Sequence, residues 1–349
     1  MYATRILAGL VTVVAAAGLL GDVSPVGGTL SAKQVAVQEV KRSEKLVTLG
    51  DLTANQNHRL AAIRQAARQQ ILTQTKAKRS QVAEVYRMAL PTKFTVQAGL
   101  TKQGVRLNLA ANTFGLSEIV IPYQQLKGKI LNHYLPKAQR TTKQNQSKVI
   151  ALTFDDGPDP KLTPKLLKIL KRNNVHATFF EVGQSVTKYP QISRAVLRSG
   201  NELGNHSWNH PDFATIGTKK TVSQINRTNA AIYQATGQLP EYVRPPYGAI
   251  TKAEGVAIEQ PIIRWSIDSK DWSYLNKAKD IKAVVGAARS GGIILMHDVH
   301  AQSVAAVPSI IRQLKAKGYR FVTVSQLLNN QTLPGLQYFE RGDSRTAGK

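Results

Sequence analysis

Short apolar segments alternate with helical segments through the second half of this chain, and this alternation constrains the fold more than any other feature. The apolar segments end at Gly, Pro or charged residues, as strands do. They are Val149–Phe154, His176–Phe180, Asn201–Gly204, Tyr242–Val243, Ile262–Ile267, Gly292–Met296 and Phe321–Val324. The predicted helices between them are Thr163–Asn173, Tyr189–Gly200, Thr218–Thr236, Ala278–Ala288 and Ser303–Lys317. Such alternation predicts an α/β fold with a parallel sheet or a barrel.

The first of these strands ends at two adjacent carboxylates. Val149–Phe154 has no polar alternation, which is typical of a strand covered on both faces. Gly157 and Pro158 then end the strand and allow a bend. Because neighbouring residues of a strand point to opposite faces, Asp155 and Asp156 can serve one site only if the chain bends here. A nearby cation or arginine would relieve their repulsion, whereas an Asp-rich turn without chemistry is the alternative.

Four more polar clusters directly follow predicted strands. They are 205–211, 244–248, 268–272 and 297–298. In parallel sheets and barrels, the carboxyl ends of the strands converge on the face that carries the active site. We therefore expect all five clusters, including the two carboxylates, to meet in one cleft.

Two of the histidines in these clusters are candidate metal ligands. His206 and His210 are four residues apart, so one helical turn would bring both imidazoles to the same side. Such a pair is common by itself, but Asp156 is expected on the same rim. Two His and one carboxylate suit a catalytic zinc ion, with cobalt, nickel or manganese as alternatives. The chain has no cysteine, so thiolate ligands are excluded.

The remaining groups match the needs of a metal-assisted hydrolysis. Asp155 is the candidate base for the attacking water, with Arg244 as the partner that keeps it ionised. His297 is the candidate acid for a leaving amine, and Asp271 would hold it and raise its pKa. The backbone N–H of Tyr247 could stabilise an oxyanion.

Aromatic side chains could complete the site by contacting a sugar. Tyr247 and Trp272 offer flat apolar faces for a sugar ring. Taken singly, a structural Arg–Asp pair, a core histidine and a packing tryptophan would each explain these residues without function. Their joint placement at strand ends favours a site.

These motifs resemble those of the polysaccharide deacetylase family, also called the NodB-homology domain or carbohydrate esterase family four. The resemblance covers residues 148–329, roughly half the chain, and its motifs are Thr153–Pro158, His206–His210, Arg244–Gly248, Asp268–Trp272 and Leu295–His297. It implies a base at Asp155, an acid at His297, supporting roles for Arg244 and Asp271, and an acetyl pocket lined by Leu295. It further implies metal ligands at Asp156, His206 and His210, and a distorted (β/α) barrel with fewer than eight strands.

The beginning of the chain predicts export. Ile6–Leu20 is an almost uninterrupted apolar run, which suits a signal peptide and is short for a spanning helix of about 20 residues. Residues 1–32 are therefore predicted to be a signal peptide or an N-terminal membrane anchor. The protein is expected outside the cytoplasm, either secreted or membrane-anchored, and associated with the cell wall.

The segments before residue 148 are less regular. Residues 33–90 are predicted to be a linker and one long basic helix over Asp51–Met88, which contains no Gly or Pro. This helix could lie along an anionic polymer or dock on the next segment. Residues 91–136 are predicted to be a small accessory domain with strands at 94–96, 105–109 and 118–123. Residues 137–147 are a second linker, 148–329 the catalytic domain, and 330–349 a tail.

The net charge of +26 predicts an anionic partner, because it exceeds what solubility needs. Anionic cell-wall polymers or a membrane surface are the expected partners of the basic N-terminal half. No nucleic acid is expected, given the export signal and the lack of a recognisable nucleic-acid motif.

Together these features predict a metal-dependent hydrolase that removes N-acetyl groups from an amino-sugar polymer, with peptidoglycan N-acetylglucosamine as the preferred substrate. A chitin-oligosaccharide deacetylase and an O-acetyl polysaccharide esterase are alternatives within the same chemistry. A non-catalytic cell-wall-binding protein is the alternative from another class, and intact Asp155 and His297 argue against it.

Overall fold

The computed structural model describes residues 44–140 and 148–348. The described chain from Lys45 onward forms one compact unit. The predicted signal peptide or anchor at 1–32 and most of the predicted linker at 137–147 lie outside the described residues. Among the described residues, no helix combines the length and the hydropathy that crossing a membrane requires.

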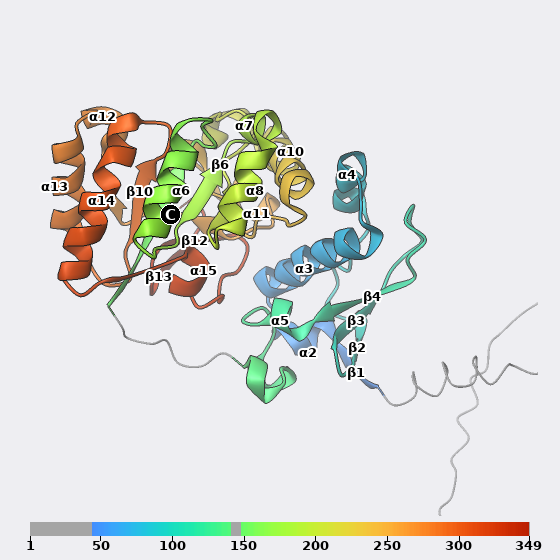
Figure 1. Ribbon diagram of the computed structural model, residues 1–349. Helices are drawn as coiled ribbons and strands as arrows, with labels where there is room; N and C mark the ends of the chain where they lie inside the picture. The colour runs from blue at the N-terminus through green and yellow to red at the C-terminus, as the bar shows by residue number, and fades with distance from the viewer. Residues whose placement is uncertain (1–43, 141–147, 349) are drawn as a thin grey trace, which may run out of the picture. The chain divides into compact units, whose positions relative to one another are not determined.

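Residues 148–348, which we call the barrel part, form a distorted barrel of short strands flanked by helices (Figure 1). Its main sheet has the order β7-β6-β5-β10-β9, and every neighbouring pair is parallel. Another strand, β11, pairs with the beginning of β5. These strands are β5 (Val149–Asp155), β6 (Thr178–Glu181), β7 (Glu202–Asn205), β9 (Ile267–Asp268), β10 (Ile293–His297) and β11 (Arg320–Val322). The predicted parallel α/β fold is confirmed.

The barrel is distorted where one predicted strand divides. The segment Ile262–Ile267 forms two strands, β8 (Ile262–Ile263) and β9, which pair with different neighbours. Val243 bridges β7 to β8 through single parallel contacts with Asn205 and Ile262. On its other side β8 pairs with β12 (Leu336–Glu340), which is antiparallel to β13 (Asp343–Thr346).

The predicted tail at 330–349 is therefore wrong, since it contains β12 and β13. Tyr338 and Ala347 are buried, and Tyr338 packs in one cluster with Val324 and Leu327. β12 pairs with β8 at two positions, Gln337 with Ile262 and Tyr338 with Ile263, so its place in the sheet depends on a partner far away in sequence.

Helices cover the outside of the sheet (Figure 1). Leu166, Leu167 and Leu170 lie on one face of α6 and join the main core, as the spacing of an amphipathic helix predicts. The helices are α6 (Leu162–Arg172), α7 (Gly183–Lys188), α8 (Pro190–Arg198), α9 (Phe213–Ile216), α10 (Thr218–Thr236), α11 (Lys252–Ala257), α12 (Asp271–Tyr274), α13 (Lys277–Ala287), α14 (Ala301–Ala316) and α15 (Val324–Leu327), with a 3-10 turn at η3 (Pro246–Gly248).

The alternation of side chains along β5 determines what faces the barrel interior. Ile150, Leu152 and Phe154 point to the core under the helices, whereas Val149 and Ala151 join the interior cluster. Each large apolar side chain buried in this way contributes about 1.5–3 kcal/mol. Continuing the alternation puts Thr153 and Asp155 on the interior face, at the carboxyl end of the strand.

Residues 44–140, the N-terminal part, form an antiparallel sheet packed against helices. The sheet order is β1-β2-β3-β4, and the strands are β1 (Lys45–Thr48), β2 (Gln97–Leu100), β3 (Gly104–Asn108) and β4 (Glu118–Pro122). Two of the predicted strands match β3 and β4, and the predicted strand at 94–96 directly precedes β2 without overlapping it. Because β1 joins this sheet, the accessory fold begins near Lys45 and not at residue 91.

The predicted long helix over Asp51–Met88 is three helices. They are α2 (Leu49–Thr53), α3 (Asn57–Thr75) and α4 (Arg79–Arg87), followed later by α5 (Tyr123–Leu126), η1 (Asn132–Tyr134) and η2 (Lys137–Gln139). Ala54, Asn55 and Lys76 take positive φ angles, which end α2 and α3 although neither Gly nor Pro is present. An apolar stripe of α3 is buried, at Leu60, Ile63, Ala67, Ile71 and Leu72.

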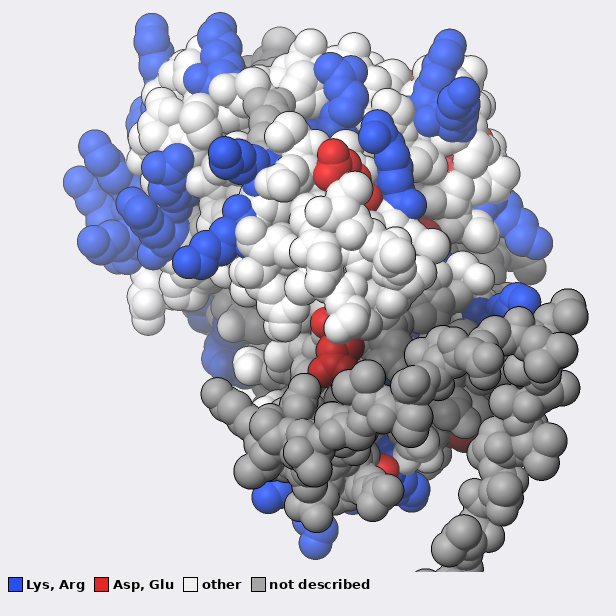
Figure 2. Space-filling model, turned by 90° about the vertical axis from the view of Figure 1, so that its right-hand side faces the viewer, with Lys and Arg blue, Asp and Glu red and all other residues white. Residues whose placement is uncertain are grey.

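The N-terminal part contacts the barrel part through α3. Arg64 and Arg68 form ion pairs with Glu259, and Arg68 Nη1 lies 2.7 Å from the carboxylate of Glu259. The Tyr233 hydroxyl of α10 donates to the Leu72 carbonyl at 2.8 Å. These two arginines are thus engaged within the protein, which favours the docked-helix interpretation of this segment. Other Lys and Arg side chains project from the surface, with few Asp and Glu between them (Figure 2).

Candidate metal centre and active site

A cavity of about 380 Å³ opens at the carboxyl ends of the barrel strands. It brings together eight of the ten predicted site residues, Asp155, Asp156, His206, His210, Tyr247, Trp272, Leu295 and His297. The other two, Arg244 and Asp271, are fully buried behind the wall and contact residues that line it. Pro245 and Asp268, which belong to the predicted clusters but had no assigned role, also line the cavity, as does Trp265, which lies outside the clusters.

Asp156, His206 and His210 form a compact donor set. Asp156 Oδ1 lies 3.5 Å from the Nε2 atoms of both His206 and His210. One donor atom from each residue lies within 4.8 Å of the others. Ligand atoms that share a tetrahedral zinc at about 2.1 Å lie about 3.4 Å apart, so these residues fit a single divalent ion.

Strained backbone, and not a helix, brings the two histidines together. His206 and His210 lie in a loop after β7, so the predicted helical turn is wrong. Ser207 and His210 have φ angles of 73° and 61°, and Asp156 has a φ of 76°. Non-glycine residues rarely adopt this region, and such conformations cluster at functional sites. The bend after β5 thus occurs at Asp156, one residue before the Gly-Pro that predicted it.

Amide side chains that had no role in the sequence prediction hold the histidine loop in place. The Asn205 carbonyl oxygen Oδ1 accepts from the Ser207 N–H at 2.8 Å. Gln224 on α10 accepts from the N–H groups of Trp208 and Asn209, at 2.8 and 3.2 Å. Amide side chains of this kind have no distinctive spacing, because their partners are backbone atoms far away in sequence.

The orientation of His206 suits a metal ligand. Its Nδ1 atom lies 2.7 Å from the Arg244 carbonyl oxygen, which can only accept, so Nδ1 carries the proton. Nε2 is therefore left unprotonated toward Asp156. Burial lowers the pKa of His206 to about 3, which keeps the ring neutral in the absence of a bound cation.

Arg244 holds Asp155 from inside the barrel. Its Nη1 atom donates to Asp155 Oδ1 at 2.8 Å and to Thr153 Oγ1 at 2.7 Å. Its other donors reach the carbonyl oxygens of Ile263 and Arg264. Burial raises the pKa of Asp155, and the charge of Arg244 opposes this rise without cancelling it. Thr153 could have been found in the sequence, because it lies two residues before Asp155 on the same strand face.

His297 and Asp271 form the second buried pair. The His297 Nδ1–H donates to Asp271 Oδ1, and the backbone N–H of His297 donates to Asp271 Oδ2, both at 2.8 Å. Burial alone would lower the pKa of His297. The hydrogen bond and the charge of Asp271, helped by Asp155 and Asp156, raise it to about 9. The contact with Asp271 thus favours the protonated, cationic form of this ring.

Comparison with known proteins places this site in a family. A model of the polysaccharide deacetylase family matches residues 142–259. The peptidoglycan deacetylase PdaC of Bacillus subtilis, in its solved structure, is 42% identical with a TM-score of 0.51, over 52% of this chain and 90% of that one. The chain belongs to the polysaccharide deacetylase family.

Other members of the polysaccharide deacetylase family differ in what they act on. The peptidoglycan-N-acetylglucosamine deacetylase PgdA of Listeria monocytogenes is 39% identical over 231 residues, which is 65% of this chain and 50% of that protein. PdaC is named a peptidoglycan-N-acetylmuramic acid deacetylase and matches at 37% identity over 63% of this chain. The chain spans about half the length of these curated relatives, 50% and 51%.

One family member was solved with a metal. The acetyl xylan esterase of Clostridium thermocellum, in complex with a cobalt ion, is 36% identical with a TM-score of 0.51, over 52% of this chain and 91% of that one. The donors at the candidate site of this chain, two imidazoles and a carboxylate, suit several divalent ions.

Aromatic side chains stand at the rim of the deacetylase cavity. Tyr247 is 70% exposed and Trp272 is 56% exposed, although both are large and partly apolar. The Tyr247 ring lies 4.6 Å from that of His210, and Tyr247 has a φ of 56°. Leu295, in contrast, is buried in the cavity wall, in register with Thr153 of β5.

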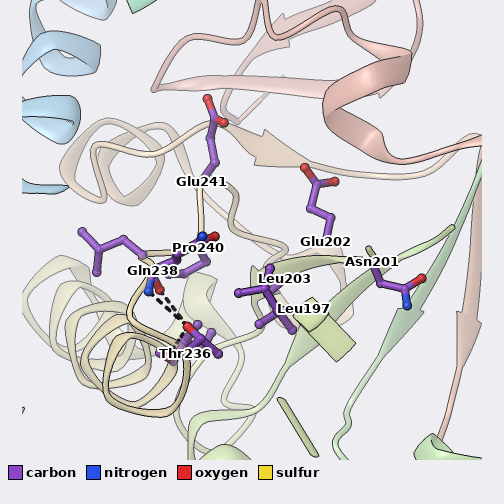
Figure 3. Close-up of a pocket in the computed structure, with 10 residues that line it drawn as sticks. Leu197, Asn201, Glu202, Leu203, Thr236, Gln238, Pro240 and Glu241 are labelled. Atoms are coloured by element: carbon purple, nitrogen blue, oxygen red, sulfur yellow. Dashed lines mark hydrogen bonds between the residues drawn. The ribbon is translucent and has the colours of Figure 1, made fainter. Parts of the chain in front are cut away.

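Another cavity of the barrel part lies at the opposite end of β7. Asn205 ends β7 beside the histidine loop. Glu202 begins β7 and lines a cavity of about 250 Å³ (Figure 3). Glu202 and Glu241 both line this second cavity, and burial raises the pKa of Glu202 to about 7. No His lines it, so it lacks the imidazole donors of the metal site.

Proposed function

We propose that this chain is a metal-dependent hydrolase that removes N-acetyl groups from N-acetylglucosamine in peptidoglycan. The observation that carries the proposal is one cavity that brings the donor triad together with Asp155, which Arg244 holds, and His297, which Asp271 holds. Membership of the polysaccharide deacetylase family and the names of PgdA and PdaC support the substrate class.

Asp156, His206 and His210 would hold the divalent ion. We propose zinc, with cobalt, nickel and manganese as ions that the same donors could accept. A bound divalent ion would lower the pKa of a water molecule and polarise the acetyl carbonyl. The neutral, oriented ring of His206 needs no proton release before it binds, which favours this assignment.

Asp155 would act as the general base. It lines the cavity, and its Oδ2 atom lies 3.7 Å from His206 Nε2, so it is next to the donor triad. Arg244 occupies the other oxygen of Asp155 and fixes the direction of the carboxylate. The attacking water would pass its proton to Asp155, whose pKa, already raised by burial, makes it a stronger base than an exposed aspartate.

His297 would act as the general acid. Asp271 takes the Nδ1–H, so Nε2–H is the proton that can be given to the leaving amine nitrogen. The exposed faces of Tyr247 and Trp272 would hold the sugar ring, and Leu295 would contact the acetyl methyl. The N–H of Tyr247 is the proposed oxyanion donor.

We further propose an extracytoplasmic location, secreted or N-terminally anchored, on the basis of the apolar segment Ile6–Leu20. The charge of +26 supports an anionic wall polymer or membrane surface as a neighbour.

The test is acetate release from purified peptidoglycan, chitin oligomers and acetylated xylan, each with zinc and with chelator. We expect chelator-sensitive release that is fastest on peptidoglycan. Release that is fastest on xylan would assign the chain to the O-acetyl esterases, as the acetyl xylan esterase relative allows. No release from any substrate with metal supplied would reject the enzyme and leave a wall-binding protein.

A further inference from the structure

A large groove lies on the other side of the histidine loop from the catalytic cavity, and the proposed chemistry does not use it. Its volume is about 920 Å³, against about 380 Å³ for the catalytic cavity. Residues of α4 and of α10 line its two walls. Trp208, which stands between the donor histidines His206 and His210 in the sequence, also lines it.

The lining of this groove is cationic. Arg87, Lys219 and Arg227 line it, and all three are exposed. Its other polar lining residues are neutral, and none of the lining residues is acidic. By contrast, the cavity in Figure 3 is lined by Glu202 and Glu241. A concave surface lined by one sign of charge concentrates ligands of the opposite sign.

The walls of the groove are held together before any ligand binds. Asn229 of α10 donates to the Tyr86 hydroxyl of α4 at 2.7 Å. Tyr233, one turn further along α10, packs in the core of the N-terminal part. The Arg227 guanidinium lies 4.1 Å from the centre of the Trp208 ring. This contact orients the charge of Arg227 and removes water from one face of its guanidinium. A preformed site costs less ordering entropy when it binds.

The groove and the metal site share one loop. The Trp208 N–H donates to Gln224, which lies on α10 like Lys219 and Arg227. His206 and His210 face the catalytic cavity, and Trp208 faces the groove. A polymer whose acetylated sugar occupies the catalytic cavity could therefore reach the groove with a neighbouring unit.

We propose that this groove binds the carboxylate groups of a peptidoglycan strand while a neighbouring N-acetylated sugar lies in the catalytic cavity. The proposal rests on the proposed function, and it gives α4 of the N-terminal part a role in substrate recognition. Peptidoglycan carries carboxylates on its muramyl sugars and its peptides, whereas chitin carries none. Arginine and lysine are suited to such carboxylates.

The experiment measures binding of the full chain to peptidoglycan that has been freed of phosphodiester polymers. The double variant Arg87→Gln with Lys219→Gln should weaken binding about tenfold and reduce its dependence on salt. Lys165→Gln with Lys168→Gln is the matched control, because both lysines are exposed on α6 and the same charge is lost. Arg87→Lys, which keeps the charge, should bind within about twofold of the wild type.

Neutral substrates separate charge recognition from damage to the catalytic site. We expect the KM for peptidoglycan fragments to rise in the groove variant, with kcat unchanged and with KM for chitin oligomers unchanged. Equal binding by the groove variant and the α6 control would overturn the proposal. An equal rise of the KM for chitin oligomers in the groove variant would overturn the proposal as well. So would binding of the wild type that occurs only when phosphodiester polymers are present. Groove-dependent binding without acetate release would instead reject the proposed function alone.

Discussion

Asp155 combines two properties that a base beside a cation needs. Arg244 fixes its Oδ1 atom at 2.8 Å, and burial raises its pKa. Its alternation with Thr153 on β5 explains why it faces the cavity, and the left-handed φ of Asp156 explains why the next carboxylate reaches the same site. The last residue of β5 and the residue that follows it thus take separate roles in the proposed chemistry.

We predict that Asp155→Asn lowers kcat by about 10²–10⁴-fold, because the amide cannot accept the proton of the attacking water. The shape of the side chain is kept, and Asp155 is not one of the three proposed ligands, so zinc affinity should change little. Steady-state kinetics and a zinc titration of the same preparation measure both effects. Asp343→Asn, at an exposed ion pair with Arg345, is the control for losing one carboxylate. Normal turnover by Asp155→Asn would exclude Asp155 as the base.

A second prediction concerns the pH dependence of catalysis. His297 has a pKa of about 9, and an acid is active only while protonated, so activity should fall as the pH rises through that value. In Asp271→Asn the hydrogen-bonded charge that raises this pKa is lost, so the basic limb should move to lower pH. Profiles of kcat/KM against pH for both proteins measure the shift. A basic limb that stays in place would show that a group other than His297 is responsible.

At the scale of elements, β12 stabilises the strand next to the site. The Tyr338 carbonyl oxygen accepts from the Arg264 N–H at 2.8 Å, and β8 in turn pairs with Val243, the neighbour of Arg244. The hydroxyl of Tyr338 accepts from the Leu333 N–H at 2.8 Å. The segment predicted as a tail is therefore part of the framework that positions the arginine.

We predict that Tyr338→Ala lowers the free energy of unfolding by about 3 kcal/mol, since it empties a buried site and removes that hydrogen bond acceptor. Tyr274→Ala, at a side chain that is 38% exposed, is the control and should stay within about 0.5 kcal/mol of the wild type. Urea unfolding at constant pH measures both. Equal stability of the two variants would mean that β12 does not support the barrel.

The elements that the sequence predicted correctly are those with a strong local signal. The apolar run of β5 formed as expected, and the five polar clusters met at one end of the barrel. Long-range strand pairing could not be predicted from the sequence. The division of Ile262–Ile267 into β8, which pairs with β12, and β9, which pairs with β10, was therefore missed. The break of the long helix at Asn55 and Lys76 was missed because positive φ at these residues depends on tertiary packing.

For the whole molecule, several buried carboxyl groups make stability depend on pH. Burial raises the pKa of Glu181 from 4.5 to about 8 and that of Glu202 to about 7, with Ser193 and Thr178 respectively opposing the rise. The folded state then keeps protons that the unfolded state has lost, so stability falls as the pH rises through these values. His297 acts in the same direction between 6.5 and about 9, because its folded pKa is also raised.

We therefore predict that the metal-free protein loses at least about 1 kcal/mol of unfolding free energy between pH 7 and pH 9. His206 does not oppose this trend, because its lowered pKa affects stability only below 6.5. Glu181→Gln should reduce the loss, since the amide does not ionise. Urea unfolding in chelator at both pH values measures the change, and a stability that rises with pH would contradict the assignment of these groups.

The central claim is that Asp156, His206 and His210 hold one divalent ion at the mouth of the barrel. Calorimetric titration of zinc into the chelator-stripped full chain tests it most directly, with His210→Ala beside the wild type and His300→Ala as a control at a histidine outside the triad. We predict one tight site per chain in the wild type and in His300→Ala, and a loss of affinity of at least about tenfold in His210→Ala. A wild type that binds no zinc, or a His210→Ala variant that binds it as tightly, would contradict the account.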